Sequence, residues 1–125
     1  MDTVMLRSGK VIAILGSNIT DAVGKITGYL GVTSNQSGAA HYKDSPWSTY
    51  QAVLTTTSGS GTATINVYGS NDGVNFCNTA IGTITLSGVS GTNDGFTVTA
   101  PWKYVKAILT SLTGTGAACY VTQGV

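Results

Sequence analysis

Glutamate is absent from this 125-residue sequence, and charged residues together make up only 9% of it, against about 25% in an ordinary soluble domain. The five Asp nearly cancel the six Lys and Arg, which leaves a formal net charge of +1. Without a basic stripe, neutralisation of phosphates cannot supply the main binding energy, so nucleic acid is not an expected partner. Weak charge repulsion instead favours association with other subunits.

Long apolar runs are also missing. The run at residues 11–15 near the N-terminus is far shorter than the roughly 20 residues of a membrane-spanning helix. Lys10 precedes it, but no convincing cleavage site follows, as a signal peptide would require. We therefore expect no membrane partner and interpret this run as a core strand.

Residues that carry catalysis or bind metals are scarce. The one histidine, His41, has Asp44 nearby but no recognisable nucleophile motif. Cys77 and Cys119 do not have the spacing of zinc ligands, and Asp72 with two neighbouring Asn offers too few oxygens for calcium. We expect no enzyme activity, no cofactor and no metal. The two cysteines are expected to be small buried apolar groups, with a single disulfide as the alternative.

Threonine, serine and glycine dominate the chain, with 20, 12 and 17 copies respectively. Thr, together with Val, Ile and Tyr, suits a pleated, half-buried surface, while Gly and Ser supply turns. The length corresponds to one domain. The composition and the short strands between turns predict an all-β, single-domain antiparallel β-sandwich over residues 1–125, jelly-roll-like in connectivity.

An internal repeat organises the second half of the chain. Residues 46–69 align with residues 101–124 at a shift of 55, with nine identities in 24 positions and no gap. The matched residues include Pro46-Trp47 with Pro101-Trp102, Gly59 with Gly114, Gly61 with Gly116, and Ala63 with Ala118. We predict that the prolines and tryptophans have a shared structural role at the end of the sandwich and that the glycines shape turns.

Each copy of the repeat is predicted to form a β-hairpin. Period-2 alternation places every second residue of each strand on the core face. The residues expected there are Tyr50, Ala52, Leu54, Ala63, Ile65 and Val67 in the first copy and Val105, Ala107 and Leu109 in the second. Residues 1–45 are less regular: apolar residues have helical spacing, but Gly24, Thr27 and Gly28 weaken a helix, so irregular or strand structure is expected.

Four stretches of the sequence support a family resemblance. They are residues 68–76 (YGSNDGVNF), 81–88 (IGTITLSG), 100–107 (APWKYVKA) and 113–117 (TGTGA). Together they resemble small virion proteins of tailed bacteriophages, in particular the cement, or decoration, proteins on the outside of icosahedral capsids. The resemblance covers residues 46–125 and not the N-terminal segment.

The resemblance implies a jelly-roll or related β-sandwich that bridges neighbouring major capsid protein subunits on the outer capsid surface of the virion. It also implies a homo-oligomer, a homotrimer more often than a dimer. Synthesis in the host bacterial cytoplasm would keep both cysteines reduced. Many copies, each burying a moderate interface, would strengthen a shell through effective concentration.

The sequence of residues 70–76 is also similar to segments of discoidin-like and other carbohydrate-binding sandwiches. A glycan-binding or host-attachment module of the head-fibre type is therefore the alternative. Exposed aromatic residues distinguish the two interpretations: a glycan binder should expose at least two on one face, whereas a cement protein should bury Trp47 and Trp102.

Loops and termini are expected to carry the protein contacts, because the sheets bury their inner faces against each other. The residues predicted to make these contacts are Arg7, Lys10, Lys25, His41, Tyr42, Lys43, Asp44, Ser58 and Ser60.

Overall fold

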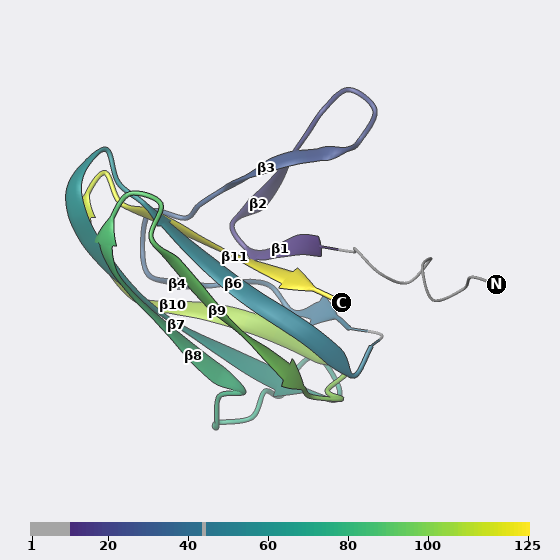
Figure 1. Cartoon of the computed structure of the whole chain (residues 1–125). Coiled ribbons are helices and arrows are strands. Elements are labelled where there is room, and N and C mark those ends of the chain that lie inside the picture. Colours follow the sequence, from purple (N-terminus) through teal and green to yellow (C-terminus); the bar gives the residue numbers. More distant parts are fainter. Residues whose placement is uncertain (1–10, 44) are drawn as a thin grey trace.

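The computed structural model describes residues 11–43 and 45–125, and in this part of the chain all regular elements are strands (Figure 1). In order they are β1 (Val11–Leu15), β2 (Ser17–Thr20), β3 (Ile26–Leu30), β4 (Gln36–Ser37), β5 (His41–Tyr42), β6 (Trp47–Thr55), β7 (Ser58–Ser70), β8 (Gly82–Val89), β9 (Asn93–Thr99), β10 (Tyr104–Thr115) and β11 (Ala118–Gly124). The described residues contain no helix that could span a membrane.

The strands form two facing antiparallel sheets, which confirms the predicted all-β sandwich. Within the described residues, the first sheet has the order β1-β11-β6-β9 and the second the order β4-β10-β7-β8, with β5 also paired to β10. Figure 1 shows the long strands β6 and β7 in different layers. From β5 onwards most connections cross from one sheet to the other.

The core lies between the sheets and follows the predicted alternation. In β6 the burial pattern alternates strictly along the strand, and β7 and β10 behave in the same way over their central residues. The predicted core residues Tyr50, Ala52, Leu54, Ala63, Ile65, Val67, Val105, Ala107 and Leu109 are all buried. Burial of these side chains is the main source of the stability of the sandwich, because apolar surface leaves water when the sheets meet.

The predicted hairpins are wrong. β6 and β7, the two strands of the first copy, do not pair with each other, and neither do β10 and β11 of the second copy. Each copy is instead an arch whose two strands lie in opposite sheets. The arches interlock: β6 pairs with β11 along seven residues, and β7 pairs with β10 along most of its length. The duplication thus produces two related halves that close over one core.

The gap-free alignment of the return strands is also wrong by one residue. In β7 the core side chains are Ala63, Ile65 and Val67, whereas in the second copy they are Ala117, Cys119 and Val121. The structural shift is therefore 54 here, and Ala118, which the sequence aligns with Ala63, lies outside the core. A shift of one residue exchanges the two faces of a strand, so the shorter second turn preserves burial where the alignment does not.

The glycines of the two arches meet at one end of the sandwich. Gly59 has a positive φ of 68°, as a turn glycine should, and Gly116 has one of 61°. Gly61 is needed for another reason: a Cβ atom there would collide with the carbonyl oxygen of Thr113 and lie 3.4 Å from the Cα of Gly114. The two turns therefore pack against each other through backbone that carries no side chains.

The N-terminal part supplies strands rather than a helix, in agreement with the preferred interpretation. β1 extends the first sheet by pairing with β11, while β2 and β3 form a separate two-stranded ribbon. Figure 1 shows this ribbon projecting from the sandwich. We call residues 17–30, which contain β2, β3 and the turn between them, the arm.

Candidate protein-contact surface

The arm exposes more apolar side chain than a surface ribbon needs. Ile19 is 45% exposed, Leu30 is 62% exposed, and Val23 at the turn is 87% exposed. All four residues of β2 are exposed as well. Single exposed apolar residues are normal on protein surfaces, but three on one projecting ribbon are typical of a contact site.

The turn of the arm is ordered by one carboxylate. Oδ1 of Asp21 accepts hydrogen bonds from the backbone N–H groups of Val23 and Lys25, each at 3.0 Å, and Gly24 completes the turn with a φ of 87°. These hydrogen bonds hold the backbone of the turn that carries the exposed Val23 side chain. Lys25, one of the predicted contact residues, lies beside it on the same turn.

The root of the arm is joined to the first sheet. Val32 and Cys119 exchange two backbone hydrogen bonds of 2.8 and 3.0 Å, and the rings of Tyr29 and Tyr120 stack with their centroids 5.3 Å apart. Gly31 allows this approach, since a Cβ atom there would lie 2.8 Å from the Cys119 nitrogen. Burial raises the pKa of the Cys119 thiol to about 11, so this group stays neutral.

A hollow of about 520 Å³ lies next to the root of the arm. Leu30 of the arm and the segment that contains β4 and His41 both contribute to its lining. His41 is half-buried there, and burial lowers the pKa of its imidazole from the ordinary value of 6.5. The ring is therefore neutral near pH 7, which suits a contact with apolar or hydroxyl groups.

Lys43, one of the predicted contact residues, is buried in the structure. Its side chain is only 2% exposed, and its Nζ donates hydrogen bonds to the backbone oxygens of Ser45, at 2.6 Å, and Ala100. Lys43 thus joins the segment after β5 to the end of β9 from inside the protein. A buried side chain of this kind cannot be a surface contact, so the prediction for Lys43 is wrong.

The other predicted contacts do not gather in one place. Tyr42 is exposed and pairs with Tyr104 at the start of β10, where the two rings meet edge to face at 5.5 Å. Ser58 is paired with Thr115 at the opposite end of the same strand, and Ser60 follows it, also exposed. At about 3.3 Å per residue, β10 separates these two ends by more than 30 Å. Arg7, Lys10 and Asp44 lie outside the described residues.

The two tryptophans have different environments despite their matched positions in the repeat. Trp102 is half-buried and covers Gly69, where a Cβ atom would collide with the indole. Trp47 is 61% exposed. Burial of both tryptophans, expected for a cement protein, is therefore not observed, and the predicted structural role holds for Trp102 better than for Trp47. Pro46 directly precedes β6, whereas Pro101 lies three residues ahead of β10.

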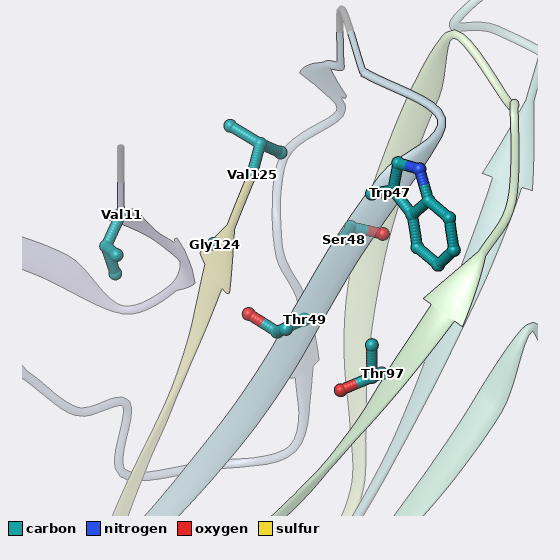
Figure 2. A pocket seen from close by; sticks show the side chains of 7 residues that line it. All are labelled: Val11, Trp47, Ser48, Thr49, Thr97, Gly124 and Val125. Carbon is teal, nitrogen blue, oxygen red and sulfur yellow. The ribbon is translucent and has the colours of Figure 1, made fainter. Parts of the chain in front are cut away.

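Trp47 borders a shallow hollow of about 270 Å³ on the first sheet (Figure 2). The residues that line it are Val11, Trp47, Ser48, Thr49, Thr97, Gly124 and Val125. In Figure 2 the indole extends beside the strand that carries Thr97, and Val11 and Val125 lie on the other side. This hollow could not be found from the sequence, because residues from both ends of the described chain line it together with residues of β6 and β9.

The loop at Asp72 forms a closed turn. The Asp72 carboxylate accepts hydrogen bonds from the backbone N–H groups of Asn75 and Val74 and from the side chains of Asn75 and Ser70. These donors, the Asn75 backbone first, hold the pKa of Asp72 well below its usual range. Residues 11–43 and 45–125 contain no cluster of His, Cys, Asp or Glu that could hold a metal ion. Both cysteines are unpaired; Cys119 is buried as expected, and Cys77 is half-buried.

Comparisons with protein-family models, curated proteins and solved structures find no match for this chain.

Proposed function

We propose that this chain is a structural virion protein that binds the outside of an icosahedral phage capsid and cements neighbouring major capsid subunits. The observation that carries the proposal is the arm, which projects from the sandwich in Figure 1 and has Ile19, Val23 and Leu30 exposed. A ribbon that buries no core residue of its own gains stability when its apolar side chains are covered by a second protein.

The surroundings of the arm fit the same function. The hollow that Leu30 and His41 help to line offers space beside the arm for a segment of the partner, and its His41 is neutral near pH 7. The low charge of the chain keeps long-range repulsion small, which suits closely spaced copies on a shell. No step in this function needs catalysis, a cofactor or a metal.

The test is binding to expanded empty capsids of the phage that encodes the chain. Wild-type protein should co-sediment with these capsids, and Val23→Asp should weaken binding at least tenfold, because a carboxylate would have to leave water at the contact. Val74→Asp is the matched control, since Val74 is 79% exposed in the loop after β7 and away from the arm. Equal binding by both variants would exclude the arm, and no binding by the wild-type protein would exclude the proposal.

The exposed Trp47 supports one second candidate, a carbohydrate-binding or host-attachment module. Its indole lies beside the hydroxyl-bearing Thr49 and Thr97 at the hollow, and aromatic faces flanked by polar groups suit the stacking of sugar rings. A glycan panel read by tryptophan fluorescence tests it. Binding that Trp47→Ala abolishes and Val23→Asp leaves unchanged would favour this candidate over capsid cementing.

A further inference from the structure

The edges of a sandwich decide whether its sheets can join to those of another molecule. An edge strand presents a row of unpaired N–H and C=O groups, and natural proteins protect such edges with bulges, charges or covering segments. The two sheets of this protein end at β1 and β9 in the first sheet and, in the second, at β8 and at the side of β10 that holds β4 and β5.

Three of these edges are protected. β1 has a register irregularity between Ala13 and Leu15, and the Asn18 side chain accepts the Ala13 backbone N–H at 2.9 Å. β9 carries a charged residue, Asp94. β10 is covered by β4 and β5, and the Asn35 side chain donates to its Thr110 carbonyl at 3.0 Å.

β8 differs from these three edges. Over its eight residues it pairs with β7 without a register shift, from Val89 opposite Ser60 to Gly82 opposite Val67. It contains no charged residue and no proline. Ile84 and Leu86 are buried in the core, while Thr83, Thr85 and Ser87 are exposed. β8 is therefore a regular, uncharged edge strand that can pair with a further strand.

The sequence of β8 indicates which strand pairs with its free edge. Read from Thr85 in both directions, residues 82–88 have the same chemical pattern: an aliphatic residue, a hydroxyl-bearing residue and then a glycine (GTITLSG). We propose that β8 pairs with β8 of a second copy of this chain, antiparallel, about a two-fold axis at Thr85. A strand from an unrelated protein would have no reason to match such a pattern, whereas an identical strand turned by 180° matches it at every position.

The pairing brings like residues together on both faces. With Thr85 opposite Thr85 of the other copy, Thr83 meets Ser87 on the outer face, where hydroxyl pairs are favourable across strands. On the inner face Ile84 meets Leu86, so the apolar layers of the two cores adjoin. Gly82 meets Gly88, so these end pairs add no side chains of their own to the contact; within each copy the Phe96 ring covers Gly82 and the Thr92 side chain lies against Gly88. No like charges meet at the axis.

The result is a dimer in which the second sheets of two copies form one continuous sheet. This inference does not rest on capsid binding, since it uses only the β8 edge. It favours a two-fold dimer over the homotrimer that the family resemblance implies more often. The arm belongs to other strands, so it remains available for a different partner.

Light scattering of the purified protein at two concentrations provides the first test. The wild-type protein should have twice the 12.7 kDa mass of the chain. Thr85→Lys should weaken self-association at least tenfold, because two ammonium groups would meet at the axis, and added salt should partly restore it. Thr99→Lys, the same exchange at an exposed threonine on the β9 edge outside the hollow beside Trp47, should remain a dimer. A wild-type monomer or trimer, or equal behaviour of the two variants, would overturn the proposal.

Crosslinking tests the register independently of any effect on folding. In a Cys77→Ser background, Thr85→Cys should form an intermolecular disulfide readily, because directly opposed Cβ atoms lie only about 4.5–5.5 Å apart. Thr83→Cys should not, since the two copies of that position would be four residues, about 13 Å, apart along the strands. Equal crosslinking at both positions would contradict pairing centred on Thr85.

Discussion

At the residue scale, Lys43 shows that a lysine in a polar loop can be buried when backbone oxygens surround its ammonium group. In sequence it lies in a polar loop between Tyr42 and Asp44, where a lysine ordinarily faces solvent. In the structure its ammonium group is enclosed and donates to the carbonyls of Ser45 and Ala100. A buried charge is tolerated because these polar partners replace the lost water.

Replacement of Lys43 with methionine should therefore destabilise the protein. The methionine side chain would keep the length and the apolar stem of lysine, but the two carbonyl oxygens would lose a hydrogen-bond donor inside the protein. We expect this loss to lower the free energy of unfolding by about 2 kcal/mol or more. Urea denaturation measures this directly. Lys103→Met, at an exposed position, should change it by less than about 0.5 kcal/mol. If the two variants proved equally stable, Lys43 would have no structural role.

At the scale of elements, the arches and the arm differ in what supports them. Each arch strand is paired with a neighbour in its own sheet and buries alternate side chains between the sheets. The arm has only its own two strands, and an isolated two-stranded ribbon is marginally stable in water. Its root is held by Val32, Cys119 and the Tyr29–Tyr120 stack, while its turn has only the contacts of Asp21.

Hydrogen exchange should separate these elements. We expect backbone amides of residues 17–30 to exchange at least a hundredfold faster than those in the centres of β7 and β10, because local opening of the arm exposes no core residue. Mass spectrometry of peptic fragments reads both regions in one experiment. Under the proposed function, a bound capsid should slow exchange in the arm. Equal protection of the arm and β7 in the free protein would show that the arm is part of the cooperative core.

At the scale of the whole molecule, few ionisable groups connect stability to pH. Cys119 is one of them, since burial raises its pKa from 9.0 to about 11. Between these values the unfolded chain loses the thiol proton while the folded chain keeps it. The unfolded state then binds fewer protons, so the free energy of unfolding falls as pH rises through this window and levels off above it.

The free energy of unfolding should fall by roughly 2–3 kcal/mol between pH 9 and 11 because of this thiol. Urea denaturation at pH 8.5 and 10.5 measures most of it. Cys119→Ala should be less stable at both pH values because of its smaller side chain, but it should lack this part of the pH dependence. Cys77→Ala should retain it. The raised pKa of Tyr50 acts in the same direction and remains in all three proteins. If Cys119→Ala had the same pH dependence of stability as the wild-type protein, the Cys119 thiol would not be its source.

Much of the proposed contact surface was not predictable from sequence. The predicted residues Lys25 and His41 lie at the arm and at the hollow beside its root, where their role as contacts stays a prediction, and the sequence did not single out the exposed Ile19, Val23 and Leu30. Their spacing resembles that of a helix, and only the turn at Asp21 and Gly24 reveals a ribbon. Lys43 was placed on the surface because a sequence does not show which backbone oxygens will surround an ammonium group.

The residue pattern alone is enough to predict the all-β class and the side chains that enter the core, because alternation with a period of two depends only on the extended backbone. Which strands pair is visible only in the fold. A hairpin and an arch bury the same alternate residues, since a strand presents one face to the core whether its partner lies beside it or across from it. The glycine-rich turns serve both equally well. Strand pairing in this protein arose from contacts between the two copies of the repeat, over distances that local patterns do not encode.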